Sequence, residues 1–288
     1  MCVGMRGPLR VARFIGYGRA DELGPVAARE ETRAIDALAG LPYAVLLADR
    51  LPDEWAGRLG GTELRRDSSP VIDIAGLDWE GYLASRSSNF RSQVRRKERK
   101  LVGESGLTYR LSETRESVDR DMETLFSLHA ARWGEGSSGA LTGMHAGFHR
   151  EFAQVARERG WLRLWVAEAG ERPIAAWYGF RFGGAEWYYQ FGRDPEWERS
   201  SIGLVLLAHT LREAIADGQR EYKLLRGGES YKERFATSKP DVVSVGVGRG
   251  PVGKAAVAGG AGVLELRRRR RGRAKEDGDP STTPPPSS

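Results

Sequence analysis

The spacing of apolar and polar positions changes twice along the chain. Residues 1–78 carry short apolar runs separated by Gly, Pro and Asp, which predicts a small mixed α/β segment. Beyond Trp79 the apolar positions recur at helical spacing. This spacing predicts helices over Phe90–Val102, Arg120–Trp133 and His145–Arg159, the first preceded by the capping run 87–89.

From Trp161 the period shortens from helical spacing to alternation, which is typical of strands. The predicted elements are, in order, the strands Trp161–Ala167, Pro173–Phe182 and Ala185–Gly192, the helix Leu204–Ala216, the strand Glu221–Leu225, the short helix Glu229–Phe235 and the strand Asp241–Val247. A strand–helix–strand crossover is parallel and right-handed, so the third and fourth strands should lie parallel in a mixed sheet flanked by helices. A ligand can enter where two such strands diverge.

The net charge of +6 is concentrated at the C-terminal end of the chain. Residues 249–288 hold nine Lys or Arg and four Asp or Glu, a net of +5, which leaves +1 for the other residues. This low-complexity stretch, with its arginine block Arg267–Arg271, is predicted to be a disordered tail. Nucleic acid is therefore an unlikely partner of the folded part, whereas the block could be simply solvated or could contact lipid or nucleic acid.

Several classes of protein are disfavoured by residues that the sequence lacks. Cys2 is the only cysteine, which excludes an intrachain disulfide framework or a multi-thiolate metal site. His145 and His149 are four residues apart but do not form an HExxH pattern, so no metal is expected. No apolar run approaches the length of a membrane-spanning helix, and a cytoplasmic protein is the default expectation.

The loop before Leu204 is the strongest candidate for a binding site. Arg193, Ser200, Ser201, Ile202 and Gly203 come between a predicted strand and a predicted helix. Backbone N–H groups at a helix start are unsatisfied and favour an anion, so this loop fits a pyrophosphate. An ordinary serine cap, with glycine present for packing, is the alternative.

Segments in this order and spacing resemble a known enzyme superfamily. The runs RSSNFRSQVRRKERKL, LFSLHAARWGEG, AAWYGFRFGG, YYQFGRDP, SSIGLVLLAHTLREAIADG and LLRGGESYKERFA are similar to the GNAT acetyltransferase domain of the CelD/BcsL type, over about 79–248. The resemblance implies the GNAT acyl-CoA N-acyltransferase fold, an α/β (α+β) class, in a bacterial-type transferase. A partial N-terminal GNAT-like lobe over 1–78 would then be either shortened or cut by the placement of the gene start.

The resemblance also implies the donor, acetyl-CoA or another acyl-CoA, and the residues that would meet it. Pantetheine would lie along the strand containing Tyr189, Gln190 and Phe191, and the pyrophosphate would sit at Ser200–Leu204. The reaction implied is attack of an amine on the thioester, which needs a base, an acid and oxyanion donors.

Candidate catalytic residues follow from the same resemblance. Tyr231 occupies the region of the thiolate-protonating tyrosine, and Glu186 and Glu229 are candidate bases or water relays. Lys232 resembles the lysine of Fem-type transferases and would hold an anionic acceptor or the developing oxyanion. The alternatives are a packing role for Tyr231, a solvated strand position for Glu186 and a surface position for Lys232.

A basic helix offers a place for an anionic acceptor. Arg91, Arg95 and Arg96 lie in a run with one acid, Glu98, and arginine suits phosphate recognition. Three functions remain open: acyl transfer from acyl-CoA to an amine, a Fem-like transfer from aminoacyl-tRNA, and a non-catalytic module that binds an anionic glycan precursor or nucleic acid.

Overall fold

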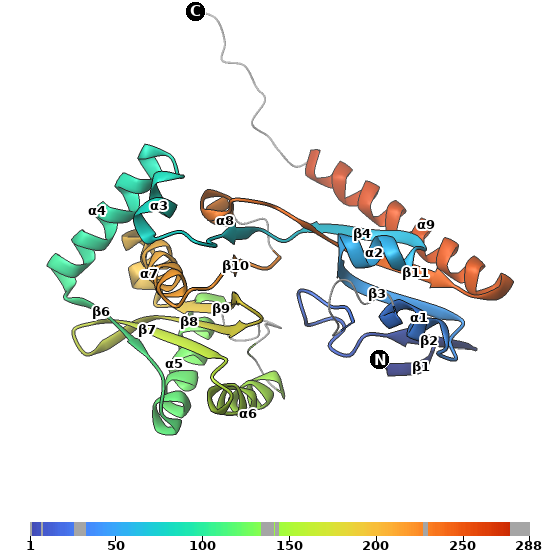
Figure 1. The fold of residues 1–288 in the computed structure, drawn as a ribbon, viewed down its shortest axis with the longest axis horizontal. Helices are drawn as coiled ribbons and strands as arrows, with labels where there is room; N and C mark the ends of the chain where they lie inside the picture. The colour runs from blue at the N-terminus through green and yellow to red at the C-terminus, as the bar shows by residue number, and fades with distance from the viewer. Residues whose placement is uncertain are drawn as a thin grey trace, which may run out of the picture. The chain divides into compact units, whose positions relative to one another are not determined.

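The computed structural model describes residues 2–6, 8–25, 33–133, 141, 144–226 and 230–276 (Figure 1). The chain divides into two compact units. Unit 1 comprises Met1–Asp67 and Asp241–Ser288, and unit 2 comprises Ser68–Pro240. The predicted boundaries at 79 and 248 differ from these because two strands take partners that the sequence pattern does not reveal. Among the described residues no helix has the length and apolar character needed to cross a membrane.

Unit 2 is built on a six-stranded mixed sheet in the order β5-β10-β9-β8-β7-β6. Its elements are β5 (Val71–Asp73), α3 (Trp79–Ala84), α4 (Ser88–Ser105), β6 (Leu107–Leu111), α5 (Arg115–Trp133), α6 (Met144–Glu158), β7 (Leu162–Ala169), β8 (Arg172–Phe182), β9 (Ala185–Arg193), the 3-10 helix η1 (Pro195–Ser200), α7 (Ile202–Ala216), β10 (Glu221–Lys223) and α8 (Ser230–Phe235). This is the α/β class, with a GNAT-like mixed sheet flanked by helices, that the sequence predicted.

Local sequence signals account for several of these elements. The Ser87 side chain accepts a hydrogen bond from Phe90 N at 3.3 Å, and α4 buries Phe90, Val94 and Leu101, as its spacing indicated. Gly183 and Gly184 both have positive φ (66° and 79°), which a two-residue β-hairpin turn of this kind requires. The predicted helices and meandering strands of unit 2 are therefore present within a few residues of their expected ends.

Helices cover both faces of the sheet of unit 2 (Figure 1). Side chains of α3, α4, α7 and α8 form one core with the sheet, which includes Tyr82, Phe90, Val205, Leu211 and Phe235. Helices α5 and α6 cover the opposite face, where a second core forms. The two faces of each strand consequently point into different environments, and this difference determines which residues can meet in a site.

Unit 1 contains a separate five-stranded sheet in the order β1-β2-β3-β11-β4. Its elements are β1 (Cys2–Arg6), β2 (Leu9–Arg13), α1 (Arg33–Ala39), β3 (Val45–Pro52), α2 (Asp53–Leu59), β4 (Thr62–Ser68), β11 (Asp241–Gly248) and α9 (Gly250–Glu276). Helices α1 and α2 contribute to the core on one face, with Leu46, Leu51 and Trp55.

The two sheets exchange strands relative to the sequence prediction. Strand β11 was expected to end the catalytic domain, but it pairs antiparallel with β3 in unit 1. Strand β5, expected in the N-terminal lobe, pairs antiparallel with β10 in unit 2. Apolar alternation predicts that a segment is a strand but not which neighbour it joins, so the sequence missed both assignments.

The predicted disordered tail is another difference, because α9 extends from Gly250 to Glu276. A Cβ at Gly253 would lie 2.2 Å from the carbonyl oxygen of Ala44, and a Cβ at Gly246 would lie 2.9 Å from Val257. The glycines therefore let the helix backbone approach the sheet, and Val257 is buried there. The small residues of α9 cannot form a core by themselves, but they let the helix pack closely against the sheet. Residues 277–288 lie outside the described part.

Candidate functional site

The candidate site of unit 2 begins where β9 and β10 diverge. The predicted parallel pair is present and runs from Glu221 opposite Ala185 to Lys223 opposite Trp187. Strand β9 continues to Arg193 and pairs with β8 along its length. Beyond Trp187 the edge of β9 on the β10 side has no paired strand within the described residues. Its backbone groups can therefore hydrogen-bond a ligand that lies along the strand.

A bulge in β9 changes which side chains face the site. Tyr178 pairs with Gln190, whereas the next residue of β8, Gly179, pairs with Tyr188, so Tyr189 is the extra residue. Tyr188 packs toward the α7 face, with its ring 5.9 Å from that of Trp177. Tyr189 packs toward α5 and α6, and its hydroxyl lies 3.3 Å from Nε2 of His149.

The candidate donor residues of β9 are consequently divided between the two faces. Phe191 pairs with Trp177 and packs in the core beside α7, whereas Gln190 pairs with Tyr178, whose side chain faces α5 and α6. Only the backbone of Tyr189 and Gln190 is available on the β10 side. Tyr188, which sequence reasoning missed, has the side chain that faces the site. Strand alternation counted from Glu186 could have found it, but the bulge could not be foreseen.

The loop from β9 to α7 brings the predicted phosphate-binding residues to one helix start. Ser201 has φ of 64° and its side chain makes no capping hydrogen bond, while Ser200 Oγ donates to the carbonyl of Trp197 at 2.5 Å. The alternative of an ordinary serine cap is therefore wrong. The N–H groups of Ile202 and Gly203 precede the first available helical acceptor.

The side chains around this helix start leave space and charge for an anion. Ile202 is fully buried, whereas Gly203 and Leu204 are half-buried. A Cβ at Gly203 would lie 3.4 Å from the ring of Phe191, an ordinary van der Waals contact, so the helix start lies close to β9. Arg193 Nη2 is paired with Glu198 Oε1 at 2.6 Å, and that glutamate is exposed. The helix start thus offers partial positive charge, whereas Arg193 shares its charge with Glu198.

Helix α8 contributes two of the predicted catalytic residues. The Tyr231 hydroxyl lies 3.4 Å from the Tyr188 hydroxyl. Lys232 is only 3% exposed, its Nζ donates to the carbonyl of Arg226 at 2.8 Å, and it lies 5.7 Å from the centre of the Tyr188 ring. The surface position considered for Lys232 is therefore wrong. Glu229 lies outside the described residues.

Glu186 is buried on the same face of β9 as Tyr188. It is 0% exposed, its Oε2 lies 3.4 Å from Nε of Arg163, and its Oε1 has no hydrogen-bond partner among the described residues. Burial raises the pKa of Glu186 to about 7, and the nearby Arg163 opposes this rise. A solvated position is therefore wrong for this residue, and it can both accept and release a proton near neutral pH.

The predicted acceptor arginines lie on α4, which is a separate element. Arg91 donates to the carbonyl of Arg86 at 2.6 Å, Arg95 is ion-paired with Glu80, and Arg96 is exposed. Within the described part of the chain, no hydrogen bond or ion pair joins these three to Tyr188, Tyr231 or Lys232. The structure brings Tyr231 and Lys232 together at Tyr188, whereas the three arginines lie on a different element.

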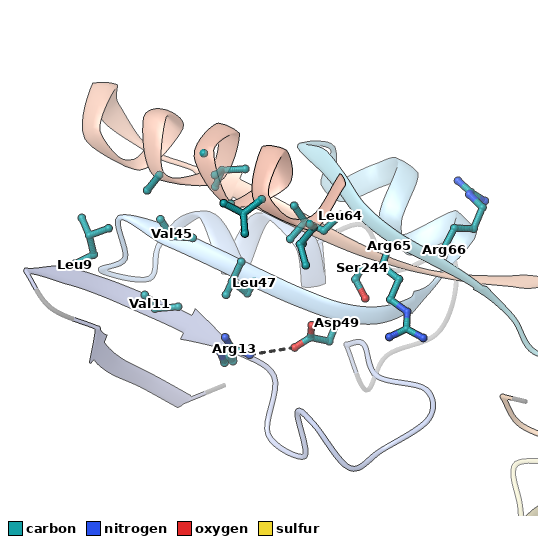
Figure 2. Close-up of a pocket in the computed structure, with 16 residues that line it drawn as sticks. Leu9, Val11, Arg13, Val45, Leu47, Asp49, Leu64, Arg65, Arg66 and Ser244 are labelled. Carbon is teal, nitrogen blue, oxygen red and sulfur yellow. Dashed lines mark hydrogen bonds and ion pairs between the residues drawn. The ribbon is translucent and has the colours of Figure 1, made fainter. Parts of the chain in front are cut away.

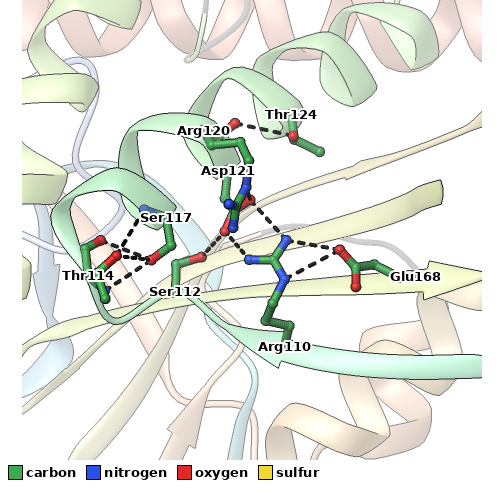
Figure 3. Close-up of polar contacts among 8 residues, drawn as sticks. All are labelled: Arg110, Ser112, Thr114, Ser117, Arg120, Asp121, Thr124 and Glu168. Carbon is green, nitrogen blue, oxygen red and sulfur yellow. Dashed lines mark hydrogen bonds and ion pairs between the residues drawn. The ribbon is translucent and has the colours of Figure 1, made fainter. Parts of the chain in front are cut away.

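A buried ion-pair network holds α5 against the sheet (Figure 3). Arg110 Nη2 of β6 donates to Asp121 Oδ1 of α5 at 3.0 Å and to Glu168 Oε1 of β7 at 2.9 Å, and Ser112 Oγ donates to Asp121 at 2.5 Å. The α5 backbone passes so close to β9 that a Cβ at Gly192 would lie 2.8 Å from His129 N. The network therefore positions a helix behind the site, and sequence reasoning did not identify it.

The histidines that the sequence considered for a metal lie apart from this cluster. His149 is buried between the hydroxyls of Tyr178 and Tyr189, at 3.5 and 3.3 Å. Over the described residues no group of His, Cys, Asp and Glu side chains is arranged to hold a metal ion. His149 has the contacts of a neutral packing residue.

Comparisons with known proteins agree with this architecture. The model of the acetyltransferase (GNAT) domain family matches residues 88–233. No curated protein matches the sequence. A C-terminal domain attributed to a lysylphosphatidylglycerol synthetase of Agrobacterium fabrum is similar in structure, with a TM-score of 0.60 and 11% identity over 89% of this chain and 82% of that one.

Two further solved structures are similar at comparable levels. FemX has a TM-score of 0.55 and 12% identity, over 77% of this chain and 79% of its own. L-PGS from Bacillus licheniformis has a TM-score of 0.54 and 11% identity, over 82% of this chain and 77% of its own. At such identities the likeness concerns the fold alone.

Proposed function

The chain belongs to the acetyltransferase (GNAT) domain family and is an acyltransferase, and on that premise we propose that it transfers an acyl group, acetyl being the simplest, from acyl-CoA to an amine. The observation that carries this proposal is the divergence of β9 from β10 directly before the uncapped start of α7. The edge of β9 would then bind the amides of the pantetheine, and the start of α7 would bind the pyrophosphate of a CoA-type donor. The CelD/BcsL subtype and a cytoplasmic location belong to the same proposal.

The donor-binding part of the proposal uses backbone groups more than side chains. The free edge of β9 beyond Trp187 can pair with amides of an extended ligand, as an added strand would. The N–H groups of Ile202 and Gly203, together with Arg193, can receive a pyrophosphate. An added Cβ at Gly203 would be in van der Waals contact with Phe191, which supports a close approach of the helix start to the strand.

In the catalytic part, the donor supplies an activated carbonyl, and residues of this chain move the protons. Glu186, with a pKa raised to about 7, accepts the amine proton directly or through water. The Tyr231 hydroxyl, 3.4 Å from Tyr188, donates a proton to the departing thiolate. Lys232 is fixed beside Tyr188 and supplies positive charge near the reacting groups. Glu229 is retained as a candidate relay on the basis of the sequence.

The acceptor is proposed to be an anionic amine bound by Arg91, Arg95 and Arg96. Arg95 already shares its charge with Glu80, so Arg91 and the exposed Arg96 would contribute most. A Fem-like transfer from aminoacyl-tRNA is the second candidate, and the buried Lys232 beside Tyr188 favours it. The similarity to FemX supports only the fold that such a reaction would use.

The direct test measures thiol release from acetyl-CoA across amino sugars, amino acids and polyamines. We expect release with at least one acceptor, and Tyr231→Phe should lower kcat about tenfold or more because it removes a general acid. Tyr109→Phe is the matched control, since it removes a buried hydroxyl elsewhere in unit 2. Transfer from aminoacyl-tRNA without any thiol release would replace the proposal with the Fem-like one. Absence of both reactions would favour a non-catalytic binding module.

A further inference from the structure

Glu186 lies among charged side chains from three neighbouring elements of unit 2. Arg163 comes from β7, and Arg181 is the residue of β8 that pairs with Glu186 across the sheet. Asp217 and Glu213 come from the C-terminal end of α7. Arg163 contacts both Glu186 and Asp217, and Arg181 Nη1 lies 3.0 Å from Oδ2 of Asp217. The carboxylates of Glu186 and Asp217 therefore share one guanidinium, that of Arg163.

The contact between Arg163 and Glu186 is the more deeply buried of these two. Arg163 Nε lies 3.4 Å from Glu186 Oε2, and the two side chains are 8% and 0% exposed. Asp217 also contacts Arg163, but its side chain is 34% exposed. Charges attract more strongly where water is excluded, and a buried carboxylate without a partner is costly. Arg163 therefore matters more for the ionised state of Glu186 than for that of Asp217.

Asp217 occupies a position at which the helix itself disfavours an acid. It is the C-cap residue of α7, and the C-terminus of a helix carries partial negative charge. Its contacts with Arg163 and Arg181 offset this unfavourable placement. A guanidinium that serves two carboxylates stabilises each of them less than it would stabilise one alone. Asp217 consequently competes with Glu186 for Arg163.

The groups that face Glu186 from α7 and β10 do not replace Arg163. Glu213 adds a negative charge that opposes the ionisation of Glu186. Tyr222 lies opposite Glu186 on β10, with its hydroxyl 2.8 Å from Oγ1 of Thr210. Burial raises the pKa of Tyr222 well above its ordinary value, so this hydroxyl stays uncharged. The permanent charge of Arg163 is therefore the largest favourable influence on the Glu186 carboxylate.

We propose that Arg163 is a positioning residue for Glu186: it holds the carboxylate in place and stabilises its ionised form, while Asp217 limits this effect by sharing the guanidinium. The inference rests on the proposed function, in which Glu186 accepts the amine proton. It predicts that removing Arg163 and removing Asp217 change the pKa of Glu186 in opposite directions. A role in packing alone would leave that pKa, and the pH profile that depends on it, unmoved.

Three substitutions in the shared ion pairs test the opposite directions. Arg163→Gln removes the charge that opposes the effect of burial, so the pKa of Glu186 should rise by about one unit or more. Asp217→Asn releases Arg163 from its second carboxylate, so the pKa should fall. Arg163→Lys keeps the charge and should restore a titration close to that of the native protein. Glu123→Gln is the matched control, because it also removes a carboxylate paired with an arginine, Arg150, but between α5 and α6.

Two measurements on the full-length protein follow the same titration. Carbon NMR of protein labelled at the glutamate carboxyl carbon reports the protonation of Glu186, whose resonance is assigned by its loss in Glu186→Gln. The pH dependence of kcat for thiol release from acetyl-CoA, with the acceptor that gives the highest rate, reports on turnover. We expect both midpoints to move upward by about one pH unit or more in Arg163→Gln, downward in Asp217→Asn and not at all in Glu123→Gln.

Several results would overturn the inference. One is a midpoint that stays at its native value in Arg163→Gln or does not fall in Asp217→Asn. Another is an NMR midpoint that moves while the pH profile of kcat does not, since Glu186 would then not be the base. Asp217 is partly exposed, so Asp217→Asn decides the matter should Arg163→Gln fail to fold. A native protein that releases no thiol, with NMR midpoints that move as expected, would reject the proposed function alone.

Discussion

The two units of the chain bury very different side chains. Among the described residues, every buried polar or charged side chain except Ser244 lies in unit 2. Unit 1 has an aliphatic groove between its sheet and α9, with Leu9, Val11 and Leu47 in its lining (Figure 2). Unit 2 holds Glu186, Lys232 and the Arg110–Asp121 network inside its layers.

This difference indicates where chemistry takes place. Burying an ionisable group costs free energy unless a partner or a function offsets that cost. Both carboxylate oxygens of Asp121 accept hydrogen bonds, from Arg110 and Ser112. By contrast, one carboxylate oxygen of Glu186 has no hydrogen-bond partner in the described structure. Strongly perturbed groups in a site are typical of catalysis, and among the described residues unit 1 buries no ionisable side chain of the kind found in unit 2.

The largest contrast between the units should appear on acidification. All four histidines of the sequence lie in unit 2. Burial lowers the pKa of His149 and of His209 to about 4. Below pH 6.5 these two histidines bind a proton in the unfolded chain but stay neutral in the folded state. Each of them should therefore lower the free energy of unfolding by about 3 kcal/mol by pH 4.

Glu186 acts in the opposite direction over much of this range. Its pKa is raised to about 7, so protonation favours the folded state as the pH falls, and the net loss in unit 2 should be about 3 kcal/mol. Hydrogen exchange, corrected for intrinsic rates, should show unit 2 opening while unit 1 stays closed. His149→Gln should remove about half of the gross loss. Equal opening of both units would contradict the expected difference in acid stability between them.

The next contrast concerns ion pairs. Asp121→Asn should lower the free energy of unfolding of unit 2 by about 3 kcal/mol, because it leaves the half-buried Arg110 and the buried Ser112 without their carboxylate. Asp53→Asn in unit 1 removes one exposed partner of Arg66 and should cost much less, because exposed ion pairs contribute little to stability. Urea unfolding followed separately in each unit checks this difference, and similar costs would show that burial does not distinguish the two pairs.

A smaller effect is expected for the buried carboxylate of the site. Glu186→Gln should lower kcat about a hundredfold and abolish the rise of activity with pH near 7, since the base must lose its proton to act. Glu151→Gln, at an exposed position of α6, is the control and should leave the profile unchanged. A profile of Glu186→Gln that keeps its limb near pH 7 would assign that limb to another group.

Most local elements of unit 2 could be predicted from the sequence, because their signals are local. The Ser87 cap, the apolar stripe of α4 and the Gly183–Gly184 turn each depend on residues within one or two turns. The exchange of β5 and β11 between sheets depends on partners far along the chain, which alternation does not specify. Helix α9 was missed because its stability comes from packing on a sheet.

The candidate site was predicted in part for the same reason. The loop at Ser200–Leu204 and the residues Tyr231 and Lys232 follow from local pattern and resemblance, and the structure gathers the last two around Tyr188. Tyr188 itself was missed because a bulge at Tyr189 sets the face of each side chain. A bulge depends on the register of two strands and leaves no residue signature in this sequence.

The measurement that tests the central claim most directly is calorimetric titration of acetyl-CoA into the native protein, Gly203→Asp and Gly203→Asn. Aspartate is favourable at a helix start, so Gly203→Asp should fold, yet its charge should repel the pyrophosphate. We predict saturable binding by the native protein, weaker binding by Gly203→Asn because of its size, and no detectable binding by Gly203→Asp. Equal affinity in all three proteins would contradict donor binding at the start of α7.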